Sequence, residues 1–309
     1  RATAQAIANQ LGINQVISEV MPQDKINLVK KLQAQGKIVA MTGDGINDAP
    51  ALRAANIGVA VGSGTEVAKE ASDLVLINNN FTIIVAAIEE GRRIIDNLKK
   101  IIAYLLSTSF SEIFVIGGAL IVGAPLPLVP AQILWANIGE EGLISFSFAF
   151  EHRDPGAMRR DPRSARAKSI MTGTLRTLIF VVSTVTGVFL IALYFLLLNM
   201  GLPIEEIRTI MFVALSLDAI FFTFSLKSLD TPIWRINPFT NTYLLIALVV
   251  SIALLILALI LPPLQKLLSL TPLSAFEVLL LVGIGIFNLM TIEVAKYVLF
   301  ERVQKNRHR

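Results

Sequence analysis

The sequence predicts a protein of two parts: a soluble α/β region with a parallel, doubly wound sheet, followed by an all-α bundle of six membrane-spanning helices. Of the 309 residues, 54% are hydrophobic and 16% are charged. The mean hydropathy of +0.67 is too high for a soluble globule of average composition. The apolar residues are also unevenly spread, because residues 1–80 have a soluble composition and residues 100–300 consist mainly of long apolar runs.

The soluble region alternates between short apolar runs and segments with helical spacing of apolar side chains. The expected helices cover residues 1–11, which end at a glycine, and residues 24–35 and 65–71. The expected strands cover residues 16–20, 37–41, 57–61 and 72–77. Strands that alternate with helices in this way are typical of a parallel sheet.

A stretch directly after the strand at residues 37–41 carries a candidate catalytic site. Its first carboxylate, Asp44, is expected at the carboxyl edge of the sheet, where α/β folds bind their ligands. The flanking glycines let the backbone turn sharply, and the residues that follow suit the start of a helix, which favours an anion. This combination indicates a Mg²⁺ site for phosphoryl transfer, and an ordinary turn is the alternative. The residues concerned are Thr42, Gly43, Asp44, Gly45, Asn47 and Asp48.

Six apolar segments are long enough to cross about 30 Å of hydrocarbon, for which a helix needs roughly 20 residues. An amphipathic helix at residues 81–100 is expected to run without a break into the first of them. The six spans are expected at residues 101–122, 129–150, 174–199, 208–228, 242–262 and 275–299. An even number of spans places both ends of the chain on the same side of the membrane.

Basic residues gather at alternate breaks between the spans, in residues 92–100, 153–168, 227–235 and 302–309. The positive-inside rule therefore predicts that the soluble region and a basic tail at residues 301–309 are cytoplasmic. We expect an integral, multi-pass protein of the plasma membrane. No basic patch is interleaved with aromatic residues, so no nucleic-acid partner is expected. The absence of cysteine excludes disulfides, thiolate metal sites and thiol catalysis.

Acidic and amide side chains within the spans are candidate ligands of a cation. A charge costs roughly 3 kcal/mol or more at the bilayer centre unless it is paired or wet. Two consecutive glutamates in the second span cannot face one site on a regular helix, whose successive residues point about 100° apart. Gly139 and Gly142 could permit local unwinding there. The candidates are Glu112, Asn137, Glu140 and Glu141, with Asp218 as a secondary one.

Oxygen ligands of this kind suit a hard cation such as Ca²⁺. The alternative is that the acids are protonated or paired with another helix, although no basic residue lies in the middle of the first two spans. Glu293 and Lys296 in the last span have the spacing of a pair within one helix.

The string from Thr42 to Leu52 closely resembles the hinge signature of P-type cation-transporting ATPases, within their haloacid-dehalogenase-like phosphorylation domain. Residues 104–112, 132–142 and 154–163 resemble the fifth helix, the sixth helix and the following cytoplasmic loop of calcium pumps. The resemblance implies that residues 1–80 are the second half of the cytoplasmic phosphorylation domain. It also implies a stalk helix at residues 81–100 and a transmembrane domain at residues 101–300.

By position, the resemblance implies that Lys25 steadies a phosphoryl group, that Asp44 holds Mg²⁺, and that Glu112, Asn137 and Glu141 bind the transported cation. The implied function is the carboxy-terminal part of an ATP-driven cation pump, with Ca²⁺ as the leading ion. The implied cofactors are Mg²⁺ and ATP, and ATP is bound mainly by a domain outside this sequence. The implied partners are membrane lipid, the amino-terminal part of the same pump and the transported cation.

Some residues depart from the calcium-pump pattern. Calcium pumps usually have asparagine where Ser109 stands, Thr-Asp where Glu140 and Glu141 stand, and in some cases a ligand where Ala219 stands. These departures leave Na⁺ or K⁺, Mg²⁺ and H⁺ as alternative ions. The Asp-Lys-Thr-Gly-Thr phosphorylation segment is absent, so this chain alone is expected to be inactive. A non-catalytic membrane subunit that binds cations or a partner is the alternative function, and an anchored soluble phosphatase fits poorly.

Overall fold

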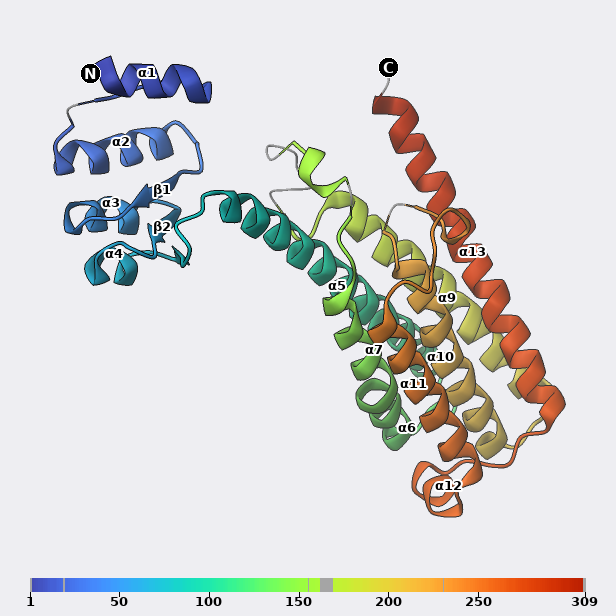
Figure 1. Ribbon diagram of the computed structural model, residues 1–309. Coiled ribbons are helices and arrows are strands. Elements are labelled where there is room, and N and C mark those ends of the chain that lie inside the picture. The colour runs from blue at the N-terminus through green and yellow to red at the C-terminus, as the bar shows by residue number, and fades with distance from the viewer. Residues whose placement is uncertain (1, 19, 155, 162–168, 230, 308–309) are drawn as a thin grey trace. The chain divides into compact units, whose positions relative to one another are not determined.

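The computed structural model describes residues 2–18, 20–154, 156–161, 169–229 and 231–307, and the side chains up to residue 298. The chain divides into two compact units, Arg1–Ile88 and Glu89–Arg309 (Figure 1). The first unit contains a small sheet with short helices. The second unit consists mainly of long helices.

The sheet of the first unit has three parallel strands in the order β1-β2-β3. Ala40 of β1 pairs with Ile57 of β2, and Val59 of β2 pairs with Leu74 of β3. The strands are β1 (Ala40–Gly43), β2 (Ile57–Val61) and β3 (Leu74–Leu76). The helices are α1 (Ala2–Leu11), α2 (Pro22–Ala34), the 3₁₀ turn η1 (Ile46–Asp48), α3 (Ala49–Ala54) and α4 (Glu66–Glu70). The parallel α/β fold is therefore confirmed.

Two expectations for this unit are corrected. Residues 16–18 and 20 form no strand, because they have no partner strand to bond with and Ile17 is exposed. The first strand of the sheet begins at Ala40 rather than at residue 37, since the preceding Ile38 points into solvent. An apolar run becomes a strand only where a neighbouring strand takes up its backbone hydrogen bonds.

The second unit begins on α5 (Thr82–Ile121), a single helix of 40 residues. It joins the amphipathic segment to the first apolar span without a break, as the sequence predicts. Among the described residues, five helices are long and apolar enough to cross a membrane. These are α5, α9 (Gly173–Asn199), α10 (Ile204–Leu226), α11 (Thr242–Ile260) and α13 (Ala275–Arg307).

The remaining predicted span, residues 129–150, is an interrupted helix. It comprises α6 (Pro130–Trp135), the π segment η2 (Ala136–Glu141), α7 (Gly142–Ser147) and the 3₁₀ turn η3 (Phe148–Phe150). The amide of Gly142 bonds to the carbonyl of Asn137 five residues earlier, which is the wide turn of a π-helix. The unwinding expected beside Gly139 and Gly142 is therefore present.

Two further segments are more helical than expected. The break after the fifth span contains the short helix α12 (Pro262–Leu268), and α13 continues to Arg307, into the segment expected to be a basic tail. Residues 301–307 consist mainly of glutamate, arginine, glutamine and lysine and contain no glycine or proline. These residue types favour a helix, so the end of an apolar run does not mark the end of the helix.

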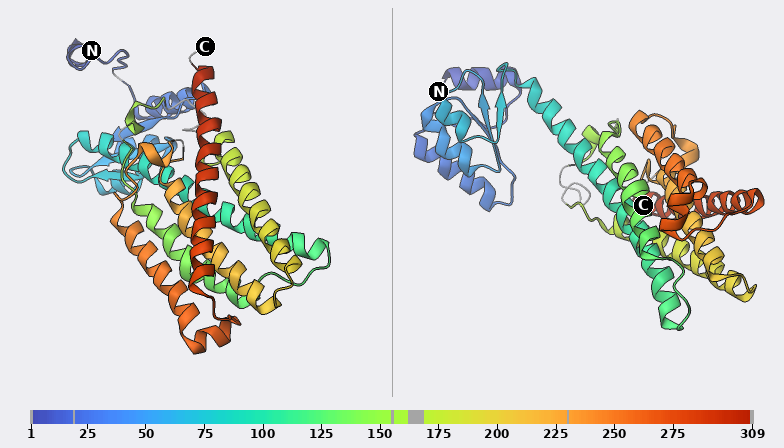
Figure 2. Two further views of the ribbon diagram at one scale, coloured as in Figure 1. Left: turned by 90° about the vertical axis from the view of Figure 1, so that its right-hand side faces the viewer. Right: turned by 90° about the horizontal axis from the view of Figure 1, so that it is seen from below.

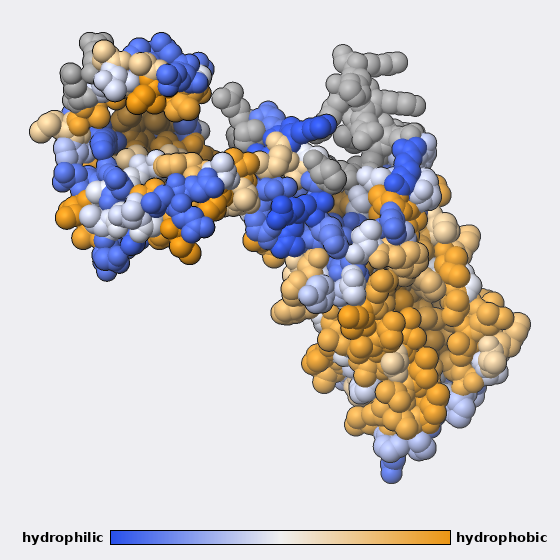
Figure 3. All heavy atoms as spheres, viewed as in Figure 1, coloured by the Kyte–Doolittle hydropathy of each residue, from blue (hydrophilic) through white to orange (hydrophobic). Residues whose placement is uncertain are grey.

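The long helices of the second unit run alongside one another in the left view of Figure 2, and α10 packs against both α9 and α13. α9 approaches α5 closely at Gly187, where an added Cβ would lie 2.6 Å from the Cβ of Phe114. The face of the bundle that Figure 3 shows is hydrophobic over most of its length. An apolar exterior of this extent is that of a protein in contact with lipid.

Candidate functional site

The loop after β1 is built around the buried carboxylate of Asp48. One oxygen of Asp48 lies 2.6 Å from the ammonium of Lys25 on α2. The other oxygen accepts hydrogen bonds from the backbone amides of Asp44 and Gly45, at 3.3 and 3.2 Å. Gly43 is required here, because an added Cβ would lie 2.5 Å from the Cβ of Asp48.

Partial burial raises the pKa of the Asp48 carboxyl, but the hydrogen bond and charge of Lys25 and the amide of Gly45 outweigh it. The pKa of Asp48 is therefore below its ordinary value. An ionised Asp48 holds both the Lys25 ammonium and the backbone of the loop in place. The structure thus brings together two predicted catalytic residues as partners of each other.

Asp44 differs from Asp48, because its carboxylate is exposed at the end of β1 and no hydrogen bond or ion pair joins it to another described residue. Its carbonyl accepts a 2.8 Å hydrogen bond from the amide of Thr65, which fixes the loop. Thr42 and Asn47 are exposed beside it. A free carboxylate on a rigid loop fits Mg²⁺, which usually takes one or two carboxylates and keeps several waters.

In the second unit, α5 and η2 bring three of the predicted polar residues together. The hydroxyl of Thr108 donates a 2.7 Å hydrogen bond to the carboxylate of Glu141. The side-chain amide of Asn137 donates to the carboxylate of Glu112 at 3.4 Å. Glu112 and Glu141 are both buried, with exposed fractions of 7% and 2%. The first two predicted spans therefore meet at Glu112, Asn137 and Glu141, with Thr108 as a partner that the sequence analysis did not assign to the site.

Glu140 is buried as completely as Glu141 but is directed elsewhere. Its carboxylate faces Ser216 of α10, and its backbone carbonyl accepts a 3.2 Å hydrogen bond from Ser251 of α11. The two neighbouring glutamates thus point toward different helices. The π turn therefore lets both glutamate side chains lie in the interior of the bundle, but it does not direct them to one common site.

Several oxygens of this region are buried without a hydrogen-bond partner. They are one carboxylate oxygen of Glu112, one of Glu141, both of Glu140 and the hydroxyl of Ser107. Burying such oxygens without a hydrogen-bond partner costs free energy, so a cation that binds oxygen atoms would be stabilised there. No three acidic, histidine or cysteine side chains converge tightly enough to hold a metal by themselves anywhere in the described part of the chain. A cation would therefore need amide, hydroxyl or water oxygens as well.

Asp218, the secondary candidate, belongs to a different polar group. The side-chain amide of Asn288 on α13 donates to Asp218 and, at 2.9 Å, to the hydroxyl of Thr186 on α9. Glu293 and Lys296 form the predicted pair at 3.0 Å and are fully buried.

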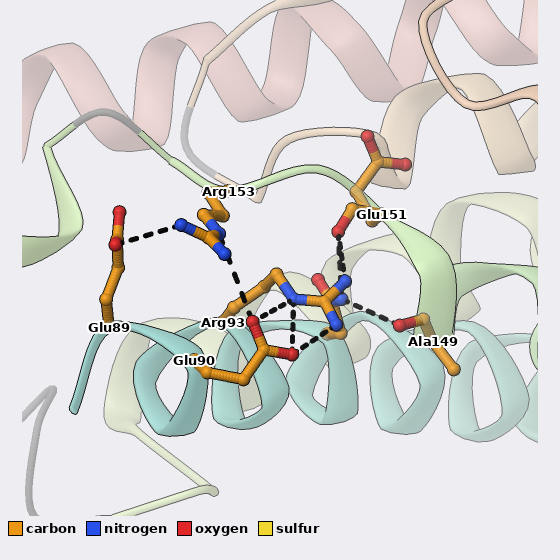
Figure 4. A network of polar contacts seen from close by, with 7 residues as sticks. Glu89, Glu90, Arg93, Ala149, Glu151 and Arg153 are labelled. Carbon is orange, nitrogen blue, oxygen red and sulfur yellow. Dashed lines mark hydrogen bonds and ion pairs between the residues drawn. The ribbon is translucent and has the colours of Figure 1, made fainter. Parts of the chain in front are cut away.

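A further network that the sequence analysis missed surrounds Glu151, directly after η3 (Figure 4). Its backbone carbonyl accepts hydrogen bonds from Arg93 and Asn97 of α5, at 3.1 and 3.2 Å. Its carboxylate lies 3.2 Å from the ammonium of Lys227 and accepts a 3.1 Å bond from Asn241. The only sequence signal for this network was an excess of basic residues beside the spans. Of those basic residues, Arg163, Arg166, Lys168 and Arg309 lie outside the described residues.

Comparison with family models gives two matches. Residues 125–298, more than half of the chain, match the family model described as cation transporting ATPase, C-terminus. Residues 1–56 match the model of haloacid dehalogenase-like hydrolases. The two matches correspond to the helical bundle and to the α/β unit.

Three curated relatives show the extent of the similarity. "Probable cation-transporting ATPase F" of Mycobacterium tuberculosis is 43% identical over 235 residues, which is 75% of this chain and 26% of the relative. "Calcium-transporting ATPase" of Bacillus subtilis is 37% identical over 272 residues, or 87% of this chain and 30% of the relative. "Calcium-transporting ATPase 1" of Bacillus cereus is 36% identical over 306 residues, or 94% of this chain and 34% of the relative.

The chain thus spans 26–34% of the length of these relatives. Its α/β unit, its membrane helices and the matched family model agree with one another. The chain belongs to the family of P-type cation-transporting ATPases, of which it represents a carboxy-terminal portion with several membrane-spanning helices.

Proposed function

We propose that this chain is the carboxy-terminal part of an ATP-driven pump, and that the ion it carries across the membrane is Ca²⁺. The observation that carries this proposal is the group of buried carboxylate oxygens without partners between α5 and η2. Two of the relatives described above are named calcium-transporting ATPases, which supports the choice of ion. Ca²⁺ takes six to eight oxygen ligands, including carboxylates, amide carbonyls and waters.

Glu112, Asn137 and Glu141 are the proposed protein ligands of the ion. Asn137 donates its amide hydrogen to Glu112, which leaves its carbonyl oxygen for a cation. Thr108 holds Glu141 on the side of α5. Glu140 and Asp218 face other helices, so we assign the ion to the first three residues. No lysine or arginine among the described residues forms an ion pair with these carboxylates, so a cation would meet no competing protein charge.

The α/β unit is proposed as the second half of a phosphorylation domain. Mg²⁺, when bound, would offset phosphoryl charge, and the exposed Asp44 carboxylate is its proposed ligand. Lys25 carries the positive charge that would steady a phosphoryl oxygen, and Asp48 holds that ammonium beside the loop. α5 carries Glu112 and is uninterrupted over 40 residues. We therefore propose it as the stalk whose movement changes the cation group.

The orientation follows from the basic residues beside the spans. We propose that the α/β unit and both ends of the chain face the cytoplasm, and that the membrane is the plasma membrane. Arg92, Arg93 and Lys227 lie at the ends of apolar segments on this side. The breaks after α9 and α11 carry little positive charge, since the second of them has only Lys266.

The test is phosphoenzyme formation in a complete pump that contains this chain. In Glu141→Gln, we expect Ca²⁺-stimulated phosphorylation from ATP to be lost, whereas phosphorylation from inorganic phosphate survives because the phosphorylation domain is intact. Glu205→Gln, at an exposed acid in the first turn of α10 and away from the cation group, serves as the control and should behave as the wild type. Unchanged Ca²⁺ stimulation in Glu141→Gln would remove this residue from the site. Stimulation of the wild type by Na⁺, K⁺ or Mg²⁺ but not by Ca²⁺ would refute the assignment of the ion.

A further inference from the structure

A polar cavity of about 850 Å³ lies at one end of the helical unit, away from Glu112 and Glu141. Its walls are the second quarter of α5, residues 151–154 with Arg160, and the described residues of the connection from α10 to α11. This volume is within the range of sites that hold small molecules. Its basic lining residues are Arg93, Lys100, Arg153, Arg160 and Lys227, and its acidic ones are Asp96, Glu151 and Asp154.

Four of the five basic residues already have carboxylate partners. Arg93 pairs with Glu90, and Arg153 lies 3.0 Å from Glu89. Arg160 pairs with Asp96 and Asp154, and Lys227 lies 3.2 Å from Glu151. The three acidic residues of the cavity are therefore occupied by Arg160 and Lys227.

Lys100 is the exception. No hydrogen bond or ion pair joins its ammonium to another described residue, although it lines the cavity. Lys227 repels it, and the carboxylates that attract it act only from a distance. Arg153 also has unused donors, since its guanidinium carries five N–H groups and, among the described residues, contacts the carboxylates of Glu89 and Glu90 alone. An ammonium without an ion-pair partner among the described residues and unused guanidinium donors in the same cavity suit an anion with several acceptor oxygens.

The position of the cavity favours a lipid as the source of that anion. Lys100 is followed directly by the apolar segment of α5, and the apolar side chains of Leu229 and Ile236 line the same cavity. Hydrophilic residues at this end of the bundle adjoin its hydrophobic surface (Figure 3). Basic pockets between transmembrane helices at such a boundary bind phospholipid head groups. Inorganic phosphate offers the same oxygens but no acyl chains for the neighbouring apolar surface.

We propose that this cavity binds the phosphate group of an anionic phospholipid, with the Lys100 ammonium as its principal contact and Arg153 as a second donor. The bound lipid would join α5 to residues 151–154 and Arg160, and to the described part of the connection from α10 to α11. It is separate from the proposed cation group, and its binding requires no transport.

The test measures retention of phosphatidylglycerol by the purified chain in lipid nanodiscs of phosphatidylcholine with and without phosphatidylglycerol, by native mass spectrometry. Lys100→Gln should weaken retention about tenfold, because a hydrogen bond between charged groups is lost. Lys100→Arg keeps the charge and should retain the lipid. Arg159→Gln is the matched control, since Arg159 is exposed at the same end but does not line the cavity.

Equal retention of phosphatidylglycerol by Lys100→Gln and Arg159→Gln would overturn the proposal. It would mean that any loss of lipid comes from the overall positive charge of this surface and not from the cavity. A wild-type chain that retains phosphatidylglycerol no better than phosphatidylcholine would overturn it as well. A separate arm adds inorganic phosphate to nanodiscs of phosphatidylcholine alone and follows thermal unfolding. Stabilisation there that depends on Lys100, without selective lipid retention, would assign the cavity to free phosphate and refute the lipid.

Discussion

Replacing Thr108 by valine removes the hydroxyl that donates a 2.7 Å hydrogen bond to Glu141 and leaves a side chain of nearly the same shape. A hydrogen bond to a charged group contributes about 1.5–3 kcal/mol, which corresponds to about 10- to 100-fold in affinity. The hydroxyl has one proton and also faces the carbonyls of Tyr104 and Leu105, each at 3.2 Å. Because Glu141 is only one of three acceptors of this hydroxyl, we expect the Ca²⁺ affinity to fall by about tenfold, which is the lower end of that range.

The assay is the Ca²⁺ concentration for half-maximal phosphoenzyme formation in a complete pump that contains the chain. The matched control is Ser109→Ala, which removes a hydroxyl from the next residue of α5, where the side chain is exposed on the bundle surface. The control should leave the half-maximal concentration unchanged. An unchanged value in Thr108→Val, or an equal shift in Ser109→Ala, would show that Thr108 does not position a cation ligand.

Three further predictions concern stability. Lys296→Met should lower the free energy of unfolding by about 3–5 kcal/mol, because it leaves the carboxylate of Glu293 buried without its cation. Thermal unfolding measures this change in free energy. A change near zero would contradict the prediction. Gly187→Ala should destabilise the bundle by about 1–3 kcal/mol, because the added methyl group overpacks the contact with α5. The control is Gly117→Ala, which should cause no such loss because a Cβ there has no neighbour within 4 Å beyond its own helix among the described residues. Equal melting temperatures of the two variants would refute the close helix contact. The pKa of Asp48 is lowered, so the stabilisation that its carboxylate gives the α/β unit is complete at neutral pH and is lost as pH falls below about 4. In Asp48→Asn, the free energy of unfolding measured against pH should lack this acid-dependent loss. A loss that persists in the variant would assign it to another group.

The elements that the sequence predicted well are those whose pattern is local. β2 occupies the predicted residues 57–61, and α5 runs unbroken through the predicted stalk and first span. In both cases, side-chain periodicity and the absence of a helix breaker are enough to decide the structure. Glycine likewise indicated the interruption in the second span, since Gly142 donates the wide π bond.

Strand pairing was not predictable in the same way. Residues 16–20 have the composition of a strand, but whether a neighbour is available to bond with them is a property of the whole fold. The short β3 shows the same effect, because only Leu74–Leu76 of the expected six residues pair with β2.

The residues of the candidate cation site were predictable, but their partners were not. A mid-span carboxylate is visible in the sequence because its burial is costly. Which helix it faces depends on how the spans pack, which their order in the chain does not reveal. Thus Glu141 meets Thr108 while Glu140 turns toward α10, and Asp218 is bound by Asn288, 70 residues further along the chain. The Glu151 network was not predicted for the same reason, since its members come from α5, from the end of α10 at Lys227 and from the residue before α11, Asn241.

The most direct test of the proposed function is an experimental structure determined with Ca²⁺ present. We expect density for an ion between α5 and η2, about 2.3–2.6 Å from carboxylate oxygens of Glu112 and Glu141 and from the side-chain carbonyl of Asn137. The proposal would be contradicted if these oxygens pointed into lipid, or if a lysine or arginine closed the space between the two helices and left no room for an ion.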